Sequence, residues 1–217
     1  MKLSKKTNKL FYDKYVYKLE STTPLALIYR ERELSKVRQT LNEFDAKVQK
    51  AGGELDISGR WYKRLVKVDD IFANIQFLTL IESESDEYCL RIEGNTVNLY
   101  TNNKELIDQV SYIKNFATEL TIPKSDKIKD YLLSNPDKVV VKEYTHKYKV
   151  IVGGLGHEAQ NFVAWANTIP KIKLSGKQRY LYDSYFYVTD LKVLGMCRLF
   201  LSKKIRKVQE LVTEQEI

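Results

Sequence analysis

The 217-residue chain is poor in the residues that mark several protein classes. Four prolines and nine glycines, with no low-complexity tract, argue against long disordered linkers. Two cysteines are too few for a disulfide scaffold, and we expect both to be reduced, buried thiols of a cytosolic protein. The apolar runs are short and interrupted by Lys, Arg or Gln, well below the roughly 20 residues of a membrane span.

No targeting segment is expected either, because the basic start Met1–Lys6 has no apolar stretch behind it. The chain is rich in Lys, Tyr, Ile and Asn, a composition typical of AT-rich genomes, including those of phages. We therefore expect a cytoplasmic protein, located in the host cytoplasm if a phage encodes it.

Signatures of catalysis and of metal binding are also lacking. His146 and His157 are the only histidines, and no Cys or carboxylate stands at metal-ligand spacing from them, so no metal or other cofactor is expected. The loop 153–156 (Gly-Gly-Leu-Gly) has neither the Lys-Ser/Thr of a P-loop nor the spacing of a dinucleotide fold, which favours a plain turn over a phosphate site. The sequence therefore predicts a protein that is not an enzyme.

One acidic stretch leaves an enzymatic alternative open. A metal-dependent nuclease needs several convergent carboxylates, and the dense supply lies at Asp69, Asp70 and residues 82–87. Asp69 and Asp70 are also typical of a helix start, and residues 82–87 of a solvated loop. We rank the nuclease below the other hypotheses.

The residue patterns favour an α+β fold of antiparallel sheets with helices packed on one side. Apolar residues at helical spacing between Leu34 and Val48 predict a helix that ends at Gly52-Gly53. Gly94-Asn95 between two alternating segments predicts a hairpin of residues 88–93 and 96–101. Further helices are expected after Asn102 or Asn103, after Ser125, at 157–169 and at 202–213. Further strands are expected at 11–19, 139–142 and 147–152, with a second hairpin of 178–182 and 185–188.

This order indicates two pseudo-repeated halves, each strand–helix–hairpin–helix, although capping residues and alternation recur by chance in many α+β proteins. Residues 14–17 resemble 147–150, and 100–107 resemble 187–194. The expected division is an N-terminal half (1–120) with an extra helix near 69–81, a connection (121–137) and a basic C-terminal half (138–217).

Positive charge is concentrated in residues 171–207, which hold ten Lys or Arg against two Asp, a net +8 equal to that of the whole chain. Tyrosines interleave with these cations, a pattern expected where a protein contacts phosphates and stacks bases. A solvated basic face is the plain alternative. A second mixed element, Arg60, Trp61 and Lys63, either contacts nucleic acid or anchors a loop.

The leading hypothesis is a non-catalytic DNA- or RNA-binding protein with weak sequence preference that favours single strands. The predicted phosphate and base contacts, besides Arg60, Trp61 and Lys63, are Lys171, Lys173, Lys177, Arg179, Tyr180, Tyr182, Lys203, Lys204, Arg206 and Lys207. The alternative is a structural or interaction subunit of a phage particle or nucleoprotein assembly, whose basic segment docks on an acidic protein surface. The sequence indicates neither a membrane partner nor an oligomeric state.

Overall fold

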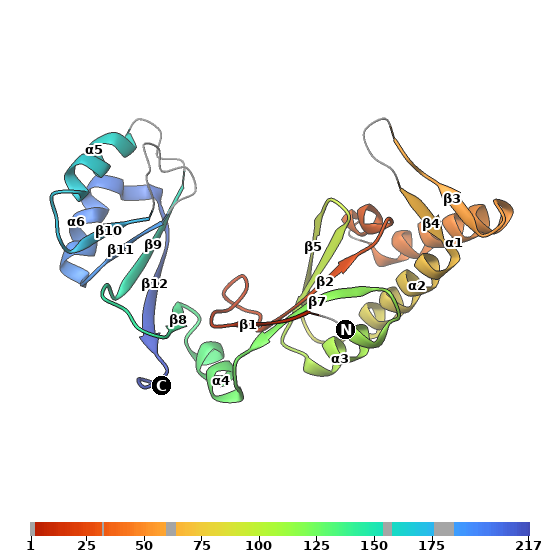
Figure 1. Ribbon diagram of the computed structural model, residues 1–217, viewed down its shortest axis with the longest axis horizontal. Helices are drawn as coiled ribbons and strands as arrows, with labels where there is room; N and C mark the ends of the chain where they lie inside the picture. The colour runs from red at the N-terminus through yellow and green to blue at the C-terminus, as the bar shows by residue number, and fades with distance from the viewer. Residues whose placement is uncertain (1–2, 32, 60–63, 154–157, 176–184) are drawn as a thin grey trace. The chain divides into compact units, whose positions relative to one another are not determined.

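A computed structural model (Figure 1) describes residues 3–31, 33–59, 64–153, 158–175 and 185–217. The described residues form an α+β protein, as the sequence predicts. The chain divides into two units by its internal contacts. Unit 1 comprises Met1–Thr7 and Lys14–Lys124, and unit 2 comprises Asn8–Asp13 and Ser125–Ile217.

Unit 1 contains a five-stranded sheet with the order β1-β7-β2-β6-β5. β1 is parallel to β7, and the other neighbours are antiparallel. The strands are β1 (Leu3–Thr7), β2 (Tyr17–Thr22), β5 (Tyr88–Glu93), β6 (Thr96–Thr101) and β7 (Ala117–Pro123). Between β2 and β5 lie the 3-10 helix η1 (Ala26–Arg30), α1 (Leu34–Lys50), the small hairpin β3 (Glu54–Asp56) and β4 (Leu65–Lys67), and α2 (Val68–Ser83); α3 (Lys104–Tyr112) precedes β7.

Unit 2 also contains a five-stranded sheet, in the order β10-β11-β9-β12-β8, and its segment Ser125–Ile217 begins with α4. β8 is parallel to β12, and the other neighbours are antiparallel. Its elements are α4 (Asp126–Ser134), β8 (Lys138–Val141), β9 (Tyr148–Val152), α5 (Glu158–Ala166), β10 (Ile172–Leu174), β11 (Tyr185–Val188), α6 (Leu191–Leu201), the 3-10 helix η2 (Ser202–Lys204) and β12 (Ile205–Thr213).

The two sheets have the same topology. When the strands of each sheet are numbered along the chain, both sheets have the order 1-5-2-4-3, with one parallel pair at the same edge. Helix caps match as well: the Asn103 side chain accepts a hydrogen bond from the backbone N–H of Leu106, and Asp190 accepts one from Val193. The shared strand order supports the pseudo-repeat expected from the sequence, with η1, α1, β3, β4 and α2 between β2 and β5 where the described part of unit 2 has α5 between β9 and β10.

The cap match also sets which residues are equivalent. It pairs 100–107 with 187–194, as the sequence predicts. Tyr100 lies beside Lys18 in unit 1, and Tyr187 lies beside Lys149 in unit 2. Lys18 is thus equivalent to Lys149, which shifts the predicted match of 14–17 with 147–150 by two residues but keeps each side chain on its face.

Most local predictions are confirmed. The hairpin turns at Gly94, whose φ is 60°, and α1 is followed by Gly52 and Gly53 with φ of 79° and 102°. Ser125 caps α4 by accepting a hydrogen bond from Ile128. Asp70 lies in the first turn of α2 and accepts a hydrogen bond from the backbone N–H at residue 67.

Two predicted elements are wrong. The expected helix 202–213 is mainly the strand β12, since it pairs along its length with β9 and β8. The expected strand 11–19 begins only at Tyr17, because Tyr12 and Asp13 adopt left-handed backbone conformations that turn the chain. The predicted strand 178–182 lies outside the described residues, and the described partners of β11 are β9 and β10.

In unit 2, α5 and α6 cover one face of the sheet (Figure 1). The packed cluster includes the large fully buried rings of Phe162 and Phe186, which lie 5.0 Å apart. The two cysteines are free thiols, Cys197 in this core and Cys89, partly exposed, in unit 1. None of the described helices has the length and apolar character needed to cross a lipid bilayer.

Candidate nucleic-acid interface

The sheet of unit 2 has a second face, opposite the one that α5 and α6 cover. Successive strand residues point to opposite faces, so the burial of Val150, Val152 and Phe186 against the helices directs their neighbours the other way. The register then places the outward residues beside one another: Tyr187 pairs with Lys149 and Lys173 on its two sides. We call Lys149, Lys173, Tyr185, Tyr187 and Lys207 the open face.

The two tyrosines of the open face form a small aromatic group. Their ring centroids lie 5.6 Å apart in an edge-to-face arrangement. The Lys149 ammonium lies 4.0 Å from the centroid of the Tyr185 ring, a cation–π contact. Tyr185 is 38% exposed, so one ring of the pair reaches solvent.

Two lysines of this face, Lys149 and Lys207, are partly desolvated. Burial lowers the pKa of both Lys149 and Lys207, and the positive charge of Lys9 lowers each pKa further. Lys207 forms an ion pair with Asp13, from the same segment as Lys9. Because a partly buried ammonium has lost water contacts, an anion beside it restores favourable interactions, which suits this cluster to a phosphate.

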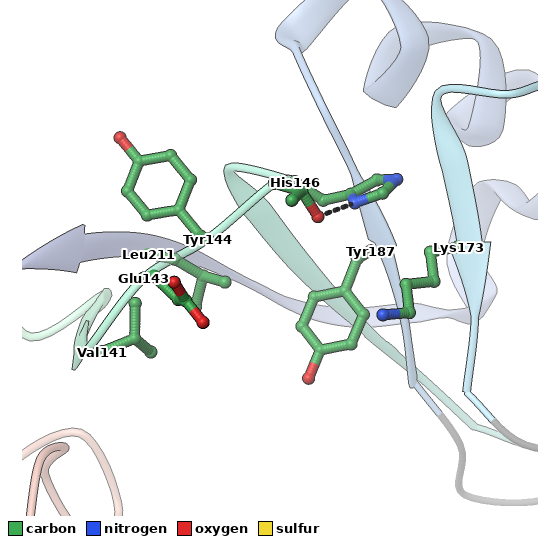
Figure 2. Close-up of a pocket in the computed structure, with 8 residues that line it drawn as sticks. Val141, Glu143, Tyr144, His146, Lys173, Tyr187 and Leu211 are labelled. Carbon is green, nitrogen blue, oxygen red and sulfur yellow. Dashed lines mark hydrogen bonds between the residues drawn. The ribbon is translucent and has the colours of Figure 1, made fainter.

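A pocket of about 400 Å³ adjoins the open face at Lys173 and Tyr187 (Figure 2). Its other wall is the loop between β8 and β9, with Glu143, Tyr144 and His146. The His146 Nδ1 and the Thr145 hydroxyl form a hydrogen bond of 2.9 Å. Burial lowers the pKa of His146, and the charge of Lys173 lowers it further, so the ring is neutral near pH 7.

The equivalent face of unit 1 has a different electrostatic character. Its cations are paired with carboxylates: Lys5 with Glu119 at 2.6 Å, Lys18 with Glu20, and Arg91 with Glu93 at 2.7 Å. A paired cation offers less to a phosphate than an uncompensated one. On the open face of unit 2, Lys149 and Lys173 have no carboxylate partner among the described residues, whereas Lys207 is paired with Asp13.

The predicted site residues that the structure describes do not all lie on one surface. Lys173 and Lys207 lie on the open face. Lys171 instead pairs with Asp190 at 3.1 Å. Lys203, Lys204 and Arg206 surround the start of β12, and the Arg206 guanidinium lies against Gly153.

The sequence predicts a helix at 202–213 that carries Lys203, Lys204, Arg206 and Lys207 on its outer side. This prediction is wrong, because β12 is a strand with a register shift between Ile205 and Lys207. The other predicted contacts lie outside the described residues. They are Lys177, Arg179, Tyr180, Tyr182, Arg60, Trp61 and Lys63.

Sequence reasoning omitted Lys149, Tyr185 and Tyr187 from the site. The signal was present, because Tyr185 and Tyr187 alternate with the apolar residues Phe186 and Val188. Alternation assigns residues to two faces but does not say which face the helices cover.

Three of the acidic side chains considered for a nuclease each bind a different polar or basic side chain instead of converging on one point. Glu82 binds Arg38, Glu84 accepts a hydrogen bond from Asn103, and Glu87 pairs with Lys14. Within the described ranges, no group of three His, Cys, Asp or Glu side chains could hold a metal ion.

No family model matches the chain, and no curated protein is similar to it in sequence.

Proposed function

We propose that the protein is a non-catalytic nucleic-acid-binding protein that contacts its ligand through the open face of unit 2. The observation that carries the proposal is the grouping of Lys149, Lys173 and Lys207 with Tyr185 and Tyr187 on one sheet face. Ammonium groups neutralise phosphates, and phenol rings stack on bases. The cations on the equivalent face of unit 1 are paired with carboxylates, whereas among the described residues Lys149 and Lys173 of the open face are not, which supports this surface over a general surface charge.

Single-stranded DNA or RNA is the preferred ligand. The aromatic groups lie on a sheet face, and the described part of unit 2 supplies this face with rings and lysines rather than with a helix that could enter a major groove. Stacking requires unpaired bases. Recognition of this kind gives weak sequence preference.

The test is fluorescence anisotropy with labelled single- and double-stranded DNA and RNA at low salt. The proposal predicts tighter binding of single strands and a loss of affinity as salt rises. Absence of binding to every oligonucleotide would refute it. The same samples with Mg²⁺ or Mn²⁺ test the nuclease alternative, and metal-dependent cleavage that is lost on changing Glu84 or Asp86 would replace this proposal.

A second candidate function, an interaction subunit of a larger assembly, is favoured by the exposed side of α6. Leu191, Leu199 and Phe200 are 64%, 86% and 49% exposed, and Phe200 stacks on Trp165 with ring centroids 4.3 Å apart. Exposed apolar groups of this kind mark contact surfaces. A stable monomer in size-exclusion chromatography with light scattering, together with tight oligonucleotide binding, would speak against this candidate.

A further inference from the structure

The pocket beside Tyr187 contains two opposite charges that do not neutralise each other. Glu143 and Lys173 both line it (Figure 2). Within the described parts of the chain, neither forms a hydrogen bond or an ion pair. Their charged groups are therefore free to bind a ligand that offers hydrogen-bond donors on one edge and acceptors on another.

The rest of the lining is suited to a flat ring. Tyr187 contributes an aromatic face, and Val141 and Leu211 contribute apolar contacts. His146 also lines the pocket, with its Nδ1 bonded to Thr145 and its Nε2 buried without a hydrogen-bond partner among the described residues. The volume of about 400 Å³ falls in the range of roughly 300–1,000 Å³ found for small-molecule pockets.

The charge pattern selects among the four bases. A carboxylate only accepts hydrogen bonds, and an ammonium only donates them. Guanine presents two adjacent N–H donors, at N1 and N2, and two acceptors, O6 and N7, on the neighbouring edge. Adenine, cytosine and uracil or thymine each place an acceptor next to the donor that a carboxylate could bind.

We propose that this pocket binds one unpaired guanine of a single-stranded nucleic acid, with Glu143 accepting from N1–H and N2–H, Lys173 donating to O6 or N7, and Tyr187 stacking on the base. This inference rests on the proposed function and deepens it. The base must be unpaired, because a Watson–Crick partner would occupy the edge that Glu143 reads.

The experiment compares labelled ten-residue thymidine oligonucleotides that carry one central guanine, adenine or hypoxanthine. Guanine should bind tighter than adenine by on the order of tenfold, as expected for one bidentate base contact. Hypoxanthine should be intermediate, because it lacks the 2-amino group. In the Glu143→Gln variant the ratio of guanine to adenine affinity should fall to about one, whereas the loss of a negative charge beside Lys173 should raise the affinity for every oligonucleotide alike.

The outcomes separate this inference from the proposed function. No binding of any oligonucleotide refutes the proposed function. Binding with equal affinity for guanine and adenine, or a guanine preference that survives in Glu143→Gln, refutes the guanine pocket alone. Binding of GMP as tight as that of the guanine oligonucleotide would overturn the assignment of a nucleic-acid strand as the ligand and identify a free nucleotide instead.

Discussion

Replacing Lys149, Lys173 and Lys207 together with Gln should flatten the salt dependence of single-strand binding. For single strands, each phosphate that a protein neutralises contributes about −0.7 to the slope of log K against log salt. With an all-thymidine strand, in which Lys173 has no guanine to contact, Lys149 and Lys173 then account for a slope of about −1.4. Lys207 adds about −0.7 more if it exchanges Asp13 for a phosphate on binding.

These slopes correspond to changes in affinity that are easily measured. Between roughly 50 and 200 mM salt, a slope of −1.4 is a loss of about sevenfold, and a slope of −2.1 is a loss of about eighteenfold. Anisotropy titrations of the wild-type protein and the triple variant at four or five salt concentrations would give the difference in slope directly. A value near 2 rather than near 1.4 would show that Asp13 is displaced.

The matched control replaces Lys5, Lys18 and Arg91 of unit 1 with Gln, which removes the same charge from the equivalent face. Because these three cations are paired with carboxylates, their loss should change the slope by less than half as much. Equal changes in the two triple variants would mean that net charge alone drives binding. That result would refute the assignment of the interface to unit 2.

Three further predictions concern stability and reactivity. Gly195 lies within α6 with open space around its Cα, so Gly195→Ala should raise the free energy of unfolding by about 0.5–1 kcal/mol in urea titration. Burial and the charge of Lys173 lower the pKa of His146, so the unfolded chain binds a proton where the folded chain does not. The free energy of unfolding should therefore fall as the pH drops below about 6.5, and less so in His146→Gln. Burial raises the pKa of Cys197 to about 11, so a thiol reagent at about pH 8 should modify at most Cys89 until the protein is denatured.

Elements whose signals are local could be predicted from the sequence. The Gly94-Asn95 turn, the Asn103 cap of α3 and the Ser125 cap of α4 depend on residues within one turn of each other. The same locality made the repeat detectable, because the cap of α3 and the cap of α6 follow equivalent tyrosines. Sheet order depends on pairing between distant segments, and no local pattern specified it.

The error at β12 shows where local reasoning fails. Ile205, Val208 and Val212 stand at helical spacing, yet Leu211 and Val212 are both buried in a strand that pairs with β8 on one side and with β9 on the other. Ile205, Val208 and Val212 are compatible with both a helical and an extended reading, and the local pattern does not decide between them. Tertiary pairing decides between them.

Comparison of equivalent positions suggests how the two halves have diverged. With Tyr100 equivalent to Tyr187, the strand registers make three further pairs equivalent on the faces opposite the helices: Asn98 with Tyr185, Glu20 with Ile151, and Glu119 with Lys207. In each pair unit 1 has a polar or acidic residue, and unit 2 has an aromatic, apolar or basic one. The inner faces differ too, since the buried Thr101 and Ser21 of unit 1 are equivalent to Val188 and Val152 of unit 2. The outer-face differences are of the kind expected when one copy of a repeated fold binds a polyanion and the other does not.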